Sequence, residues 1–216
     1  MGSLSVVEAV TVDVLVDWLS AFRDAVHEHG SYLTELDSAI GDADHGANLI
    51  RGMDAVMAAV SPSPPEQPGD LLKKVGMTLV TSVGGASGPL YGTFFLRMAT
   101  ACGEAPSLDG AALLASLQAG LEGIVARGKA ELGDKTMYDA LAPALSSFAA
   151  ALESGASVAD AARAAASAAA EGRDATEPMQ ALKGRASYLG ERSVGHLDPG
   201  AASSALLLES LAGALS

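Results

Sequence analysis

The sequence predicts an all-α protein of about eight helices, folded as a single domain over residues 1–216. Apolar residues make up 49% of the chain, but aromatic residues only 4%, and much of the apolar share is alanine and leucine. That composition is typical of packed helices and not of sheets. Apolar residues also recur at helical spacing along the chain, whereas no useful run shows the alternation of a strand. The length suffices for one domain with a full core.

The first three helices are expected over residues 11–28, about 31–39, and from about 47 to 60. The first repeats an apolar residue at every fourth place, and the third repeats them three and four places apart: Val14, Trp18, Phe22 and Val26, then Leu49, Met53, Val56 and Val60. Residues 40–46 are expected to form a loop closed by Gly46, and the proline-rich run 61–65 ends the third helix.

In the middle of the chain, Asp70 is expected to cap a helix whose buried stripe is Leu72, Val75, Leu79, Val80 and Val83. The glycine-rich run 84–88 breaks that helix. Pro89 then suits the first turn of a helix that continues to about Cys102. Asp109 is expected to cap the next helix, which ends near Gly128. The remaining helices are expected at about 137–153, 157–171 and 201–215.

Charge and composition exclude several classes of partner. The formal net charge is −13, so neither nucleic acid nor an anionic membrane surface is an expected partner. Residues 75–96 carry no charge, but glycine, proline and hydroxyl residues interrupt the stretch too often for a membrane span. A single cysteine, Cys102, excludes an internal disulfide, and no signal-peptide pattern is visible. A cytoplasmic location is expected.

The most informative stretch is residues 36–48, where Asp37, Asp42 and Asp44 lie within eight residues. Carboxylates so close repel one another unless a cation lies among them. The spacing does not fit an EF-hand, because with Asp42 as the first position of the loop the twelfth is Met53 and not glutamate. Magnesium normally takes one or two carboxylates and completes its shell with water and phosphate oxygens, so three acids suggest two Mg²⁺ ions bridged by a nucleotide diphosphate. The alternative is a set of solvated loop acids or helix caps.

Other unusual residues also fall at helix junctions, in residues 84–88, 128–136 and 184–200. In an up-down bundle, alternate junctions lie at the same end. Four such loops can therefore form one pocket of helix N-termini and glycine amides, which suits a phosphate. Each cluster also has a structural explanation: close helix packing for 84–88, an ordinary cap for 134–136 and an ordinary loop for 184–200. A near match to a phosphate-binding P-loop at 123–130 lacks the hydroxyl and the preceding strand.

The sequence resembles the ADP-binding L subunit of dihydroxyacetone kinase, the DhaL family, which is equivalent to the nucleotide domain of the single-chain ATP-dependent enzymes. The resemblance is carried by four motifs that follow in family order from the second predicted helix to the last. They are Leu-Asp-Ser-Ala-Ile-Gly-Asp-Ala-Asp-His-Gly at 36–46, Gly-Gly-Ala-Ser-Gly-Pro-Leu-Tyr-Gly at 84–92, Gly-Asp-Lys-Thr-Met at 133–137 with Asp-Ala-Leu at 139–141, and Gly-Arg-Ala-Ser-Tyr-Leu-Gly-Glu-Arg at 184–192 leading to His-Leu-Asp-Pro-Gly at 196–200.

The resemblance implies a closed barrel of eight antiparallel helices with the nucleotide and metal site in the loops at one end. Asp37, Asp42 and Asp44 are implied to hold two Mg²⁺ ions against the phosphates of ADP or ATP. No residue is implied to act as a catalytic nucleophile. The implied nucleotide-binding residues are His45, Gly46, Ala47, Asn48, Ala86, Ser87, Gly128, Met137, Arg185, Asp198, Pro199 and Gly200. One departure is Ala43, where the family usually has glycine; alanine is costly there if the backbone needs positive φ.

The implied activity is that of a phosphoryl-transfer subunit in a dihydroxyacetone kinase. The sugar is held on a separate K subunit, so this chain alone is not expected to phosphorylate it. The phosphate is expected from a phosphohistidine on an M subunit, and thus from phosphoenolpyruvate. The alternative is an ATP-dependent kinase for dihydroxyacetone or a related keto-sugar. A transcription regulator and a second copy of the chain are further candidate partners. A competing hypothesis is a hydrolase that uses Ser87, His196 and Asp198, although no nucleophile-elbow motif supports it.

Overall fold

The computed structural model describes residues 9–216 and is helical almost throughout. Within that range it forms eight α-helices and one 3₁₀ helix: α1 (Val12–Ile40), α2 (His45–Val60), α3 (Pro68–Ser82), α4 (Ser87–Cys102), α5 (Gly110–Gly128), α6 (Met137–Glu153), α7 (Val158–Ala175), η1 (Arg185–Ser193) and α8 (Pro199–Ala214). The described residues contain no strand, only an isolated bridge between Val10 and Leu108. The all-α prediction is therefore confirmed.

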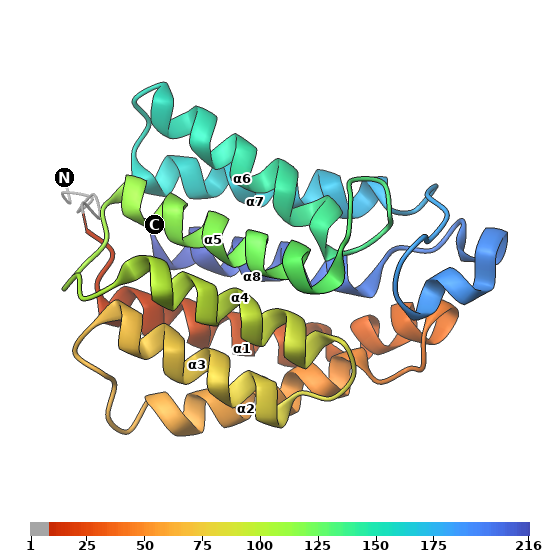
Figure 1. The fold of residues 1–216 in the computed structure, drawn as a ribbon, viewed down its shortest axis with the longest axis horizontal. Coiled ribbons are helices and arrows are strands. Elements are labelled where there is room, and N and C mark those ends of the chain that lie inside the picture. Colours follow the sequence, from red (N-terminus) through yellow and green to blue (C-terminus); the bar gives the residue numbers. More distant parts are fainter. Residues whose placement is uncertain (1–8) are drawn as a thin grey trace.

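The eight α-helices pack in a closed ring. Each helix packs against the next one in sequence, and α8 packs back against α1 (Figure 1). The buried aromatic side chains lie inside this ring; Trp18 of α1 stacks near Phe95 of α4, and its indole N–H donates to the Leu207 carbonyl of α8 at 2.8 Å. Burial of these large rings adds to the apolar core that the leucine, valine and alanine side chains form.

The first two predicted helices are one continuous helix, α1. The prediction of a break near residue 30 is wrong because Gly30 lies buried inside the helix and does not end it. A side chain on Gly46 of α2 would overlap the Gly30 carbonyl oxygen, so the two glycines mark the place where α1 and α2 approach most closely. Gly46 likewise does not close the loop: α2 already begins at His45.

Three smaller predictions also differ from the structure. Helix α3 begins at Pro68, so Asp70 lies in its first turn and does not cap it. Val80 points outward and is 46% exposed, while Leu71 takes a buried place in the stripe. The 3₁₀ helix η1 was not predicted, because its polar sequence has neither the length nor the apolar spacing of an α-helix.

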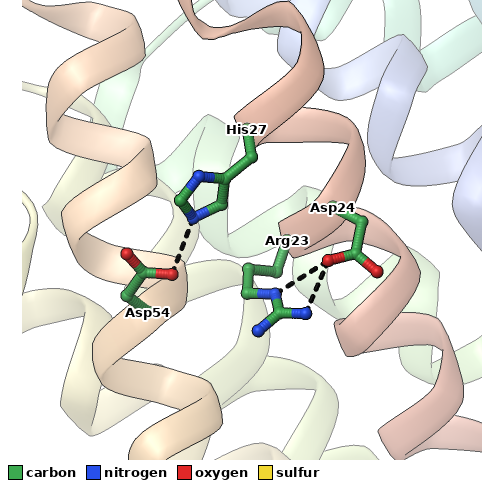
Figure 2. A network of polar contacts seen from close by, with 4 residues as sticks. All are labelled: Arg23, Asp24, His27 and Asp54. Carbon is green, nitrogen blue, oxygen red and sulfur yellow. Dashed lines mark hydrogen bonds and ion pairs between the residues drawn. The ribbon is translucent and has the colours of Figure 1, made fainter.

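Polar contacts on the surface of the ring add local links between neighbouring helices. Figure 2 shows His27 of α1 beside Asp54 of α2, with 2.8 Å between the imidazole Nε2 and the carboxylate oxygen. Arg23 pairs within α1 with the adjacent Asp24. Both pairs are solvent-exposed and contribute little to stability.

None of the helices in residues 9–216 combines the length and the apolar character needed to cross a membrane. Within the uncharged run 75–96, α3 and α4 are separate helices joined by the glycine loop.

Candidate functional site

A cavity of about 800 Å³ opens at the end of the ring where α2, α4, α6 and α8 begin. Its lining comes from the first residues of these four helices, from the end of α1 and from the segment 182–188. The connecting loops gather at the right-hand end in Figure 1, away from the C-terminus. Each helix N-terminus contributes a partial positive charge, and no side chain caps the first N–H groups of α4, so the cavity suits an anion even though the chain is acidic.

Three carboxylates stand at the wall of this cavity. Asp37 lies near the end of α1, Asp42 in the following loop and Asp44 directly before α2, and one oxygen of each lies within 4.8 Å of the others. Asp37 is buried, and its Oδ2 accepts hydrogen bonds from the backbone N–H groups of Asp44 (2.8 Å) and His45 (3.1 Å). The carboxylate of Asp37 therefore takes the place of a cap for α2 and holds the loop in shape.

The chemistry of this donor set fits a hard divalent cation. Clustered carboxylate oxygens are the ligands that Mg²⁺ prefers, and a cation would offset the repulsion among the three acids. Asp42 and Asp44 are only partly covered, which leaves room for water or phosphate oxygens in the coordination shell.

Ala43 adopts a φ of 61°, in the left-handed region that favours glycine. The loop thus has the backbone conformation for which glycine would be the natural choice, and alanine adopts it at a cost. The turn at this residue separates Asp42 from Asp44 while keeping both on the cavity side.

Arg185 faces the acid cluster from the opposite wall. Its guanidinium lies 3.0 Å from the Asp42 carboxylate, and both side chains are solvent-exposed. An exposed ion pair is weak, so Arg185 can exchange this carboxylate for a phosphate, which its fork of donors also fits.

His45 lies buried between the cavity and the core. Its Nδ1 is 3.0 Å from the Ser87 hydroxyl at the start of α4, and its Nε2 is 2.9 Å from the Ser203 hydroxyl of α8. Burial lowers the pKa of the imidazole, although the nearby Asp37 and Asp44 carboxylates act in the opposite direction. Ser87 thus hydrogen-bonds to His45, not to His196 as a hydrolase triad would require, and His196 is exposed.

Asp198 caps α8 by accepting a hydrogen bond from the Ala201 N–H at 2.7 Å. Burial raises the pKa of its carboxyl to about 7, and the neighbouring Asp139 carboxylate adds to the rise. Lys135 and the N–H groups of residues 200 and 201 act in the opposite direction. The site therefore holds one carboxyl that gains or loses its proton near neutral pH.

Lys135 is buried and connects the loop before α6 with the segment 177–193. Its ammonium donates to the carbonyls of Ser193 (2.5 Å), Met179 (2.9 Å) and Glu177 (3.4 Å). Burial lowers the pKa of Lys135, while the charges of Asp198 and Glu177 favour its ammonium form. This contact anchors the segment that continues into Arg185.

The structure brings most of the predicted nucleotide-binding residues together. Eight of them line the cavity: His45, Ala86, Ser87, Met137, Arg185, Asp198, Pro199 and Gly200. Four do not. Gly46 packs against α1, Ala47 is exposed to solvent, Asn48 accepts a hydrogen bond from Arg51 at 2.6 Å, and Gly128 is exposed at the end of α5.

Sequence reasoning missed Lys135, Tyr91 and Ser203 as parts of the site. Lys135 and Tyr91 lie inside motifs that attracted notice, but neither spacing nor residue type indicated what they contact. Ser203 gives no signal at all, because a serine in an alanine- and leucine-rich helix is unremarkable.

Comparisons with known proteins all point to one family. Residues 39–213 match the family described as the DAK2 domain. The chain is 47% identical to the "PEP-dependent dihydroxyacetone kinase, ADP-binding subunit DhaL" of Escherichia coli K12, over 92% of this chain and 94% of that protein. It is 45% identical to the "PTS-dependent dihydroxyacetone kinase, ADP-binding subunit DhaL" of Lactococcus lactis, over 94% and 97%. Among solved structures, the dihydroxyacetone kinase of C. freundii in complex with AMP-PNP and Mg²⁺ superposes with a TM-score of 0.73 at 25% identity, covering 99% of this chain and 36% of the kinase chain.

Proposed function

The chain belongs to the DAK2 domain family, and on that premise we propose that it is the ADP-binding, phosphoryl-transferring subunit of a multi-subunit dihydroxyacetone kinase. The observation that carries the proposal is the three-carboxylate cluster at a cavity formed by four helix N-termini. In this arrangement a diphosphate is bound by metal ions on one side and by backbone N–H groups on the other.

Asp37, Asp42 and Asp44 would hold the metal, and we propose two Mg²⁺ ions, as the number of acids suggests. Bound there, Mg²⁺ neutralises the charge of the phosphate oxygens during transfer. The chain's own residues bind and orient the nucleotide: the Arg185 guanidinium exchanges the Asp42 carboxylate for a phosphate oxygen, and the N-terminus of α4, which no side chain caps, provides N–H donors. The chain thus acts through position and charge, with no nucleophile of its own.

A sugar-binding partner subunit is the next part of the proposal. The chain corresponds to 36% of the C. freundii kinase chain, so much of that enzyme has no counterpart here. Exposed apolar side chains lie at the cavity end: Leu182 (58% exposed) and Tyr188 (88%) line the cavity, and the Leu182 N–H donates to the Asp134 carbonyl, close to Leu132 (66%). Such side chains beside a ligand site favour a protein partner.

For the phosphoryl donor we propose a phosphohistidine subunit charged from phosphoenolpyruvate; the names of the bacterial relatives, "PEP-dependent" and "PTS-dependent", support this choice. Mixing the chain with a dihydroxyacetone-binding subunit and either donor distinguishes the two routes. Product should form with the phosphoenolpyruvate-driven phosphohistidine protein and only slowly with free ATP. Rapid turnover with ATP alone would favour the ATP-dependent alternative.

The metal site is tested by Asp42→Asn, with Asp54→Asn as the control that removes the same charge from an exposed position of α2 outside the cavity. We expect Asp42→Asn to weaken Mg²⁺-dependent ADP binding by about tenfold or more, measured by titration calorimetry, and Asp54→Asn to leave it unchanged. Unaltered ADP affinity in Asp42→Asn would refute the proposed site.

The partner surface is tested by Tyr188→Ser and Leu182→Ser. Met77→Ser on α3 is the matched control, because Met77 is as exposed as Leu182 but lies outside the cavity. We expect the first two variants to raise the concentration of sugar-binding subunit needed for half-maximal rate. If Met77→Ser has the same effect, the surface is wrongly placed.

A further inference from the structure

A chain of buried polar groups leads from the cavity into the core of the ring. It runs from Ser87 to His45 (3.0 Å), then to Ser203 (2.9 Å), to the Tyr91 hydroxyl (2.7 Å) and to Ser204 (3.1 Å). Ser203 and Ser204 are completely buried among apolar side chains, and Tyr91 is nearly so. Polar groups at such depth are costly unless each is hydrogen-bonded, so the direction of every bond in the chain matters.

The Ser203 hydroxyl determines these directions. It has one hydrogen but three polar neighbours: the Gly200 carbonyl at 3.1 Å, His45 Nε2 and the Tyr91 hydroxyl. A carbonyl can only accept, so all three contacts are hydrogen bonds only if Ser203 donates to Gly200 and accepts from the other two. His45 must then carry a hydrogen on Nε2.

We infer that Ser203 is a positioning residue that holds His45 in the Nε2–H form and thereby aims the Ser87 hydrogen at the bare Nδ1, away from the cavity. In a neutral imidazole with hydrogen on Nε2, Nδ1 is an acceptor, and the Ser87 hydroxyl 3.0 Å away is the group that donates to it. Ser87 then presents only lone pairs to the cavity that it lines.

A phosphate bound in the cavity reverses the direction of these hydrogen bonds; this step rests on the proposed function. Phosphate oxygens only accept, so Ser87 must turn its hydrogen towards them. Nδ1 then faces an oxygen without a hydrogen between them, and the stable arrangement places the imidazole hydrogen on Nδ1. Ser203 turns its own hydrogen from the Gly200 carbonyl to Nε2. One proton leaves Nε2 and one is gained at Nδ1, so the charge of His45 does not change.

The two arrangements are distinguished by the ring ¹⁵N chemical shifts of His45. Protein labelled with ¹⁵N-histidine is measured at pH 8, where an imidazole with an ordinary pKa of about 6.5 is already neutral. His45→Gln assigns the signals. Without ligand we expect hydrogen on Nε2 and a bare Nδ1. With ADP and Mg²⁺ we expect the reverse.

Ser203→Ala and Ser204→Ala form a matched pair, since both serines are fully buried on α8 but only Ser203 contacts His45. We expect Ser203→Ala to shift both ring nitrogens towards values for a mixture of the two forms and to weaken ADP binding about fivefold, the effect of one lost hydrogen bond. Ser204→Ala should keep the wild-type shifts.

Hydrogen on Nδ1 in the ligand-free wild-type protein would overturn the inference, and this measurement needs no variant to fold. Unchanged ¹⁵N shifts in Ser203→Ala would also overturn it. If ADP binds but His45 keeps its Nε2–H form, the reversal is wrong. If ADP does not bind at all, the proposed function fails while the ligand-free assignment can still hold.

Discussion

Ala43 holds a backbone conformation that L-amino acids seldom adopt, and it does so between two candidate metal ligands. The left-handed region costs a residue with a side chain about 1 kcal/mol or more relative to glycine. We therefore predict that Ala43→Gly raises the free energy of unfolding by about 1 kcal/mol in metal-free buffer, as measured by urea denaturation.

Ala47→Gly is the control for that substitution. Ala47 is an exposed residue of α2, where glycine is expected to lower stability by up to about 1 kcal/mol. The same substitution should thus change the free energy of unfolding in opposite directions at two positions four residues apart. Equal signs would show that the conformation at Ala43 is not strained.

Asp198 makes the stability of the fold depend on pH, and a single substitution can isolate its contribution. Its folded-state pKa of about 7 lies above the ordinary value for aspartate, so the folded state keeps a proton that the unfolded state loses. Stability from this group is therefore present at low pH and is lost as the pH rises from about 4 to about 7. Asp198→Asn keeps a neutral acceptor for the Ala201 N–H.

We predict that Asp198→Asn becomes progressively more stable than the wild type over that pH range, and that the difference is constant above it. The measurement is thermal unfolding at a series of pH values. Asp109→Asn, an exposed cap of α5 with the same bond to a backbone N–H, gives the effect of changing a cap alone. A difference for Asp198→Asn that is flat between pH 4 and 7 would contradict the prediction.

Among single residues, the three acids could be predicted from the sequence because their crowding is local and needs a cation to offset it. Ser203 and Lys135 could not be, because their roles depend on contacts with residues far away in the chain. Asn48 and Gly128 were implied as nucleotide-binding residues by the family resemblance and not by a local pattern; neither lines the cavity, and the Asn48 side chain accepts a hydrogen bond from Arg51.

At the scale of elements, the close packing of α1 against α2 positions the loop that carries Asp42 and Asp44. Gly30 falls between the two helices predicted at 11–28 and about 31–39, and glycine weakens helices locally. It stays helical because its missing side chain lets α2 approach, a gain from tertiary packing that local propensity does not contain. Helix boundaries set by local signals, such as the Asp109 cap and the start of α6 at Met137, could be predicted from the sequence.

We predict that Gly46→Ala lowers the free energy of unfolding by about 3 kcal/mol, because the new Cβ would overlap the Gly30 carbonyl and the backbone has no side chain that could move aside. Gly213→Ala is the control: nothing lies within 4 Å of its added Cβ. It should be neutral or slightly stabilising. Chemical denaturation measures both, and a Gly46→Ala protein as stable as the wild type would mean that α1 and α2 are not in close contact.

For the molecule as a whole, the ring closes so that four helices start at one end, and the site draws on helices from both halves of the sequence. This convergence was expected from where the unusual residues fall, since alternate junctions of an up-down bundle share an end. The exact lining was not, because the segment 182–188 and the 3₁₀ helix η1, which it overlaps, have no periodic pattern.

The net charge of −13 leads to a prediction about how ligands stabilise the fold. ADP alone meets an acidic protein and three unneutralised carboxylates, so it should stabilise the fold little. With Mg²⁺ present, the metal neutralises the carboxylates and the phosphates together, and the bound nucleotide links the ends of several helices.

We predict a rise in the unfolding temperature of about 5–10 °C at ligand concentrations about 100 times the dissociation constant, because binding to the folded state alone then adds about 2.7 kcal/mol to the free energy of unfolding. Scanning calorimetry with ADP, Mg²⁺ or both measures it, and EDTA should reverse the joint effect. AMP with Mg²⁺ is the control, because it lacks the diphosphate that bridges the metal site. An equal rise with ADP in EDTA would mean that the nucleotide binds without using the three acids.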